Sequence, residues 1–144
     1  HHPKFITMLK MIYENYNTCH VHHATGYKKM EWYIKAFQAN PKARWFFGID
    51  GTPDVSHKYR INQDGQKLFE VMRESVKHLQ IKPIWQYIVF RYNEDPKMIE
   101  KANQMANDIG AEFMITHSSR WWHGEDDPYR PINPEVRIDI ENKY

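Results

Sequence analysis

Two long apolar segments most constrain the fold that this chain can adopt. Ala43–Ile49 and Ile84–Phe90 are almost continuously hydrophobic and rich in aromatic residues. Strands that are apolar on both faces are typical of a parallel sheet covered by helices. In a half-exposed strand, apolar and polar residues alternate instead. The helical stripe Leu68–Leu79 lies between the two segments. We therefore expect a β-α-β unit in which the two strands run parallel.

The same alternation of helix and strand extends over most of the chain. It predicts an α/β fold, a mostly parallel sheet of about four strands with covering helices. A closed barrel needs about eight strands, so the sheet is open or part of something larger. Asp95 and Pro96 are a favourable helix start, and Gly110 a favourable helix end. The predicted helices are 5–16, 30–40, 68–79 and 96–109, and the predicted strands are 18–25, 43–49, 84–90 and 111–116.

The length of 144 residues, 41% of them hydrophobic, fits one globular domain. We expect an α/β core over residues 1–120. Residues 121–144 contain Pro128, Pro131 and Pro134 and have little periodicity, so they form a surface wrap or a linker. Within them, Val136–Ile140 is predicted as an edge strand.

Composition argues against several kinds of partner and of structural site. The 20 basic residues are spread among 18 acidic ones, for a net charge of +2, so no nucleic-acid partner is expected. No apolar run approaches the roughly 18 residues of a membrane span. One cysteine rules out a disulfide framework and an all-cysteine metal site. We expect a cytoplasmic protein.

In open parallel sheets, ligands bind beyond the C-terminal ends of the strands. Asp50 follows a buried strand and can accept hydrogen bonds from ribose hydroxyls. Gly48 permits close approach to the backbone, and Arg60 has the fork geometry that binds a carboxylate. A plainer alternative is that Asp50 and Gly51 only form a turn and that Arg60 is solvated. The predicted strand ends are His23–Gly26, Asp50–Arg60, Tyr92–Glu94 and His117–Arg120.

The order of these segments resembles the middle and C-terminal part of a radical S-adenosylmethionine domain. The resemblance covers roughly residues 5–120. It is most specific from Trp45 to Glu94, which includes Gly48-Ile-Asp-Gly51, His57, Tyr59-Arg60 and Asn93-Glu94. It implies a partial (β/α)6 TIM-like barrel whose strand ends bind S-adenosylmethionine. In complete members a 4Fe-4S cluster cleaves this cofactor to a 5′-deoxyadenosyl radical.

The resemblance also implies roles for individual residues. Gly48 and Asp50 correspond to positions that contact the ribose and the methionine part, and Arg60 to an arginine that pairs with the methionine carboxylate. Asn93 corresponds to the asparagine that closes the fifth strand of the family. Thr25 and Gly26 occupy a turn that is usually Thr-Asn-Gly, with Thr25 where asparagine is usual.

The family's CxxxCxxC cluster loop is absent, and Cys19 lies in a predicted strand. One cysteine cannot hold a 4Fe-4S cluster, which needs three thiolates here. The chain is therefore predicted to be a fragment or degenerate form of such an enzyme that binds S-adenosylmethionine but is not catalytic by itself. Whether it is an enzyme stays open. A complete member would act on a peptide or small-molecule substrate.

Two other functions stay open. The first is a non-catalytic α/β interaction module. The second is a metal-dependent hydrolase in which His20 and His22, alternate residues of one strand, face one pocket with Asp50 nearby. If the chain starts after the second strand of the radical S-adenosylmethionine family, Thr18–Thr25 becomes an edge strand, and it contains no Lys, Pro or acidic residue. Such an edge recruits another chain, so we expect a homo-oligomer unless Val136–Ile140 folds back to cover it.

Overall fold

The structure is a computed structural model, and it describes residues 2–116, 118 and 127–134. The segment Val136–Ile140 and most of His117–Arg120 lie outside the described residues. No helix in the described part of the chain is long and apolar enough to cross a membrane. The helices are α1 (Phe5–Asn15), α2 (Met30–Ala39), α3 (Gly65–Ser75) and α4 (Pro96–Ile109). The strands are β1 (His20–His23), β2 (Arg44–Gly48), β3 (Ile84–Ile88) and β4 (Glu112–Thr116), and a short 3-10 helix, Ser56–Lys58, follows β2.

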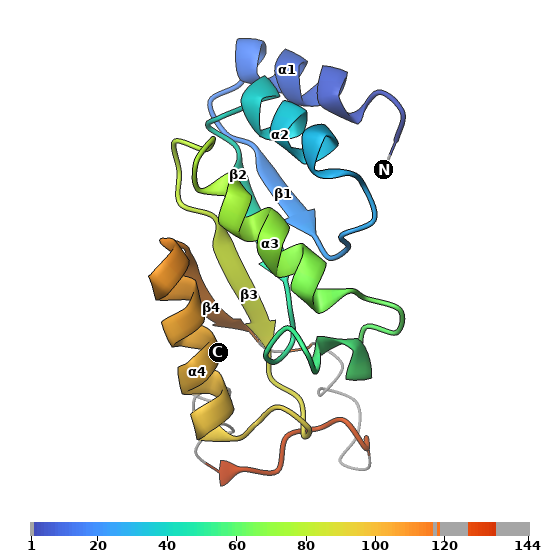
Figure 1. Ribbon diagram of the computed structural model, residues 1–144, viewed down its shortest axis with the longest axis vertical. Coiled ribbons are helices and arrows are strands. Elements are labelled where there is room, and N and C mark those ends of the chain that lie inside the picture. The colour runs from blue at the N-terminus through green and yellow to red at the C-terminus, as the bar shows by residue number, and fades with distance from the viewer. Residues whose placement is uncertain (1, 117, 119–126, 135–144) are drawn as a thin grey trace.

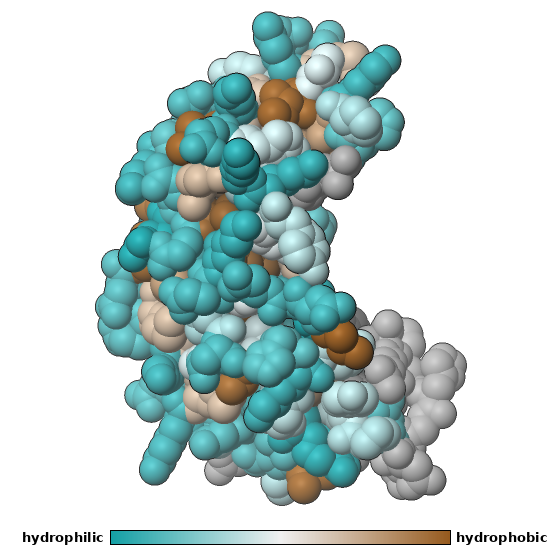
Figure 2. Space-filling view, turned by 45° about the vertical axis from the view of Figure 1, so that its right-hand side comes forward, coloured by the Kyte–Doolittle hydropathy of each residue, from teal (hydrophilic) through white to brown (hydrophobic). Residues whose placement is uncertain are grey.

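The predicted α/β fold with a four-stranded parallel sheet is confirmed. The strand order is β1-β2-β3-β4, so each new strand is added beside the previous one (Figure 1). With right-handed crossovers, strands added always in the same direction place their connecting helices on the same face of the sheet. This is the winding of a barrel wall, and Figure 2 shows a molecule with a curved, crescent-like outline.

Aromatic side chains fill the space between the sheet and its helices. Trp45, Phe47 and Trp85 are fully buried, and Phe47 is the register partner of Trp85 on the neighbouring strand. Phe37 of α2 meets Trp45 edge-on at 4.9 Å between ring centroids, and Phe69 of α3 lies 5.5 Å from Trp85. The two long apolar segments thus contain the central strands β2 and β3. Their packing in the core fixes the positions of the two strand ends relative to each other.

The ends of α4 agree with the signals in the sequence. The Asp95 carboxylate accepts a hydrogen bond from the Lys97 backbone N–H at 3.0 Å, and Pro96 is the first helical residue. Gly110 ends the helix with a φ of 82°, a conformation that glycine adopts without steric cost. β1, in contrast, is shorter than predicted, because only His20–His23 pair with β2.

His23 is a buried histidine on the helix-facing side of β1. Its Nε2 atom lies 3.1 Å from the Tyr33 hydroxyl, and its ring meets Trp45 and Phe47 edge-on. Burial lowers the pKa of His23 to about 4. The ring is therefore neutral at pH 7, and a proton added to it enters a mostly aromatic environment.

We predict that acidification destabilises the fold through His23. The unfolded chain binds this proton below the ordinary pKa near 6.5, whereas the folded chain binds it only near 4. The free energy of unfolding should therefore fall by about 3 kcal/mol between pH 7 and pH 4 from this residue. Urea unfolding across that range measures it. His23→Gln should lose this pH dependence and exposed His22→Gln should keep it; equal slopes in both variants would contradict the assignment.

The outer edge of β1 is open in the part of the chain that the structure describes, because β1 is the first strand of the sheet. The Cys19 carbonyl accepts a hydrogen bond from the Arg44 N–H of β2 at 2.8 Å. Backbone groups alternate in direction along a strand, so those of His20 and His22 point to the open edge. Both side chains are exposed, and His20–His23 includes no Lys, Pro or acidic residue that would guard the edge.

We propose that two copies of the chain associate through this edge. Sedimentation velocity at micromolar concentration should then show a dimer. Hydrogen-exchange measurements on that dimer should show that the His20 and His22 amides are protected. Lysine at an edge opposes pairing, so His22→Lys should favour the monomer, while exposed His57→Lys on the loop after β2 should not. A monomer whose His20 and His22 amides are nonetheless protected would point to a cover from within the same chain.

Candidate functional site

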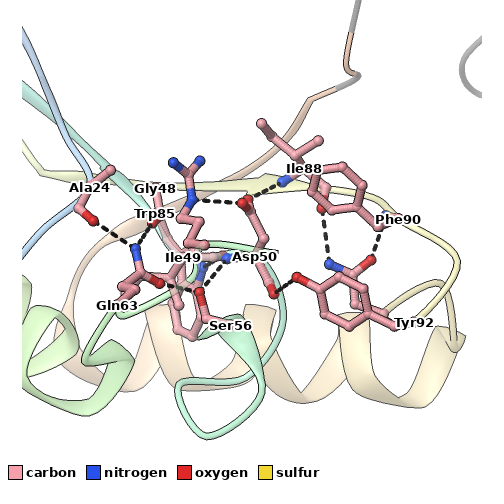
Figure 3. Close-up of polar contacts among 12 residues, drawn as sticks. Ala24, Gly48, Ile49, Asp50, Ser56, Gln63, Trp85, Ile88, Phe90 and Tyr92 are labelled. Atoms are coloured by element: carbon pink, nitrogen blue, oxygen red, sulfur yellow. Dashed lines mark hydrogen bonds and ion pairs between the residues drawn. The ribbon is translucent and has the colours of Figure 1, made fainter. Parts of the chain in front are cut away.

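The C-terminal ends of β1, β2 and β3 meet at one edge of the sheet, as the predicted site requires. Gly48 is the last residue of β2, and Asp50 follows it by two positions. The chain then forms a loop that passes through the 3-10 helix and returns to the sheet edge before α3 begins at Gly65. Polar contacts between this loop and the strand ends build the site (Figure 3).

Asp50 is completely buried at the centre of this network. Its Oδ2 atom accepts a hydrogen bond from Arg60 Nε at 2.7 Å, and its Oδ1 atom accepts one from the Ile88 N–H at 2.9 Å (Figure 3). Its backbone N–H donates to the Ser56 hydroxyl, and its carbonyl accepts from the Tyr92 hydroxyl. Burial raises the pKa of Asp50, while the Arg60 guanidinium and the Ile88 N–H act in the opposite direction.

With these contacts, Asp50 joins the loop after β2 to the end of β3. The contact of its carboxylate with a ribose stays a prediction; in the structure, both of its oxygens accept hydrogen bonds from the protein. The spacing of Asp50 after a buried strand indicated a ligand, but it did not reveal the partner ten residues later in the loop.

Arg60 is held through one of its guanidinium nitrogens. Its Nε donates to Asp50, and a quarter of its side chain is exposed. Among the described residues, none accepts a hydrogen bond from its Nη nitrogens. The guanidinium lies against Gly48, where an added Cβ would come within 2.8 Å of Nη2. Gly48 therefore contributes by lacking a side chain, which lets the guanidinium lie against the strand.

Gln63 was not singled out from the sequence, although it joins two strand ends. Its Nε2 donates to the Ala24 carbonyl after β1 at 2.8 Å and to the Gly48 carbonyl of β2 at 2.9 Å. Its Oε1 accepts from the Ser56 hydroxyl. A buried amide that meets three partners fixes the loop against the sheet edge. Nothing in its sequence position distinguishes Gln63 from a solvated loop residue.

Asn93 is buried and forms the turn after β3. Its Oδ1 accepts from the Phe90 N–H at 2.6 Å, its Nδ2 donates to the Ile88 carbonyl at 3.0 Å, and its own carbonyl accepts from the Tyr87 hydroxyl. Asn93 thus lies in the turn that follows β3, and its amide is directed into that turn.

Thr25 and Gly26 lie on the loop after β1. The Thr25 carbonyl accepts a hydrogen bond from the Tyr33 hydroxyl at 2.9 Å. A Cβ added at Gly26 would come within 3.2 Å of the Leu68 backbone nitrogen, so this loop packs closely against the start of α3. Of the two residues, Thr25 reaches the surface hollow described next.

A hollow of about 540 Å³ opens beside these strand ends. Two of the six predicted cofactor-binding residues, Thr25 and Arg60, line it, while Gly26, Gly48, Asp50 and Asn93 are not among its walls. Tyr59 stacks on Phe90 with 3.9 Å between ring centroids, which fixes one aromatic wall. The lining residues are Ala24, Thr25, Tyr27, Tyr59, Arg60, Ile61, Gln63 and Tyr129.

His20 and His22 lie on the opposite face of β1 from His23. Both are exposed, and both rings contact Phe46 of β2, His22 by stacking at 4.5 Å. Within the described residues, no group of three or more His, Cys, Asp or Glu side chains is arranged to hold a metal ion. Asp50, the carboxylate that a hydrolase site would have used, is paired with Arg60. The geometry gives the hydrolase alternative no support.

The chain matches none of the protein-family models with which it was compared, and no curated protein matches its sequence.

We predict that Asp50 and Arg60 are strongly coupled in stability. Removing the guanidinium leaves a buried carboxylate with one N–H donor, so Arg60→Ala should lower the free energy of unfolding by about 3 kcal/mol. In the Asp50→Asn background the same change should cost much less, because no buried charge remains. Urea unfolding at pH 7 of the two single variants and the double variant measures the coupling.

The exposed pair of Arg73 and Glu70 on α3 is the matched control. Arg73→Ala should change the free energy of unfolding by less than about 1 kcal/mol. Additive costs for Asp50→Asn and Arg60→Ala would contradict the structural role given to the buried pair.

Proposed function

We propose that this chain binds S-adenosylmethionine in the hollow at the strand ends. The observation that carries the proposal is the Arg60 guanidinium beside the hollow, which Asp50 fixes through Nε while none of the described residues accepts a hydrogen bond from its Nη nitrogens. A guanidinium fork binds a carboxylate through two parallel N–H donors. The methionine carboxylate of S-adenosylmethionine is such a group.

The hollow suits a ligand of this class in size and in lining. Sites for ligands of drug-like size measure roughly 300 to 1,000 Å³, and this hollow of about 540 Å³ falls in that range. The Tyr59 ring supports stacking of an adenine base, and aromatic faces also attract cations such as the sulfonium group. The Arg60 guanidinium occupies the space that a Cβ at Gly48 would need.

The residues present do not fit an iron–sulfur cluster. A cluster of this family needs three cysteine thiolates, and the 144 residues contain one cysteine. Cys19 precedes β1 and so lies at the opposite end of the strand from Ala24 and Thr25. Burial also raises the pKa of the Cys19 thiol, which disfavours the thiolate that ligates iron. The proposal is therefore ligand binding, and no radical step is assigned to these residues.

Isothermal titration with two ligands tests the proposal. S-adenosylmethionine carries the carboxylate, whereas 5′-methylthioadenosine keeps the adenosyl group and a neutral thioether sulfur but lacks the carboxylate, the amine and the sulfonium charge. Arg60→Gln should weaken S-adenosylmethionine binding by about 10- to 100-fold, the size of a charged hydrogen-bonded contact. It should leave 5′-methylthioadenosine binding nearly unchanged.

Arg44→Gln is the matched control. Arg44 begins β2, at the opposite end of that strand from Gly48 and the hollow, and it pairs with Glu112. It should bind both ligands like the unaltered chain. No binding of S-adenosylmethionine to the unaltered chain at millimolar concentration would refute the proposal and favour the non-catalytic interaction module. Equal losses for both ligands in Arg60→Gln would refute the carboxylate contact.

A further inference from the structure

The segment 127–134, which we call the strap, returns to the ends of the strands from far along the chain. It runs past the loop after β3, at the lower end of the molecule in Figure 1. The Arg91 backbone N–H donates to the Tyr129 carbonyl at 2.9 Å, and Arg91 Nε donates to the Arg130 carbonyl at 3.1 Å. Two contacts from one residue of the loop thus fix the middle of the strap.

Glu94 holds the next part of the strap. Its Oε2 atom accepts hydrogen bonds from the backbone N–H groups of Ile132 at 2.7 Å and Asn133 at 2.8 Å. Hydrogen bonds to an ionised carboxylate are stronger than those between neutral groups. The Glu94 side chain is half-buried, and it is not among the residues that line the hollow.

A tight turn orients Tyr129 within the strap. The Asp127 side chain accepts a hydrogen bond from the Tyr129 N–H at 2.9 Å, and the Asp127 carbonyl accepts one from the Arg130 N–H at 2.9 Å. The Tyr129 ring then meets Tyr59 edge-on, with 5.5 Å between centroids, and Phe90 at 6.3 Å. Tyr129 thereby becomes a wall of the hollow that Arg60 also lines.

We infer that Tyr129 is a binding residue for the adenosyl part of the ligand and that Glu94 is a positioning residue that acts through the strap. The inference rests on the proposed function, because it concerns the same hollow. Tyr129 and Tyr59 present two aromatic rings at right angles, an arrangement that accepts a flat heterocycle against one ring and its edge against the other. The loop after β3 therefore influences binding without touching the ligand.

Titration with S-adenosylmethionine and 5′-methylthioadenosine tests the inference. Tyr129→Ala should weaken both ligands by about tenfold, the size of one lost stacking contact. Tyr129→Phe keeps the ring and should bind within about twofold of the unaltered chain. A loss confined to S-adenosylmethionine would overturn the assignment of Tyr129 to the adenosyl part.

Glu94→Gln and Glu94→Ala test the positioning role, with exposed Glu100→Gln on α4 as the matched control. Both Glu94 variants should speed hydrogen exchange at the Ile132 and Asn133 amides and weaken both ligands, Glu94→Ala by about the same factor as Tyr129→Ala. Faster exchange with unchanged affinity would overturn the inference alone, provided that Arg60→Gln still weakens S-adenosylmethionine. Absence of binding by the unaltered chain would overturn the proposed function and this inference together.

Discussion

The buried Asp50 carboxylate is the constraint on which the rest of the site depends. A charge that has no contact with water is tolerated only where it is paired and hydrogen-bonded. One partner, the Ile88 N–H, comes from the end of the neighbouring strand, and the other, Arg60, comes from a loop that must turn back to reach it. Satisfying this one carboxylate therefore fixes the path of the loop after β2.

Two further residues make that loop path compatible with the sheet. Gly48 leaves the space that the Arg60 guanidinium occupies, and Gln63 binds the carbonyls of both β1 and β2 ends. Arg60 is held through Nε, and no acceptor in the described part of the chain binds its Nη nitrogens, so these can meet a ligand without a change of conformation. A preorganised donor of this kind loses little side-chain entropy when a carboxylate binds.

Local patterns were sufficient to predict the fold but only part of the site. The apolar segments Ala43–Ile49 and Ile84–Phe90 and the capping residues of α4 act through neighbours in the sequence, so they could be read directly. The role of Gln63 depends on three partners that only the folded chain brings together. The contacts of the strap could not be predicted for a related reason, since Glu94 binds backbone N–H groups that every residue except proline carries.

The most direct measurement is the NMR signal of the Arg60 guanidinium in the free chain and with ligand. We expect a slowly exchanging Nε–H in both states, because Asp50 accepts its hydrogen bond in a buried site. The Nη protons should shift when S-adenosylmethionine is added and stay unchanged with 5′-methylthioadenosine. An Arg60 Nε–H that exchanges as fast as that of exposed Arg73, or Nη protons that respond equally to both ligands, would contradict this expectation.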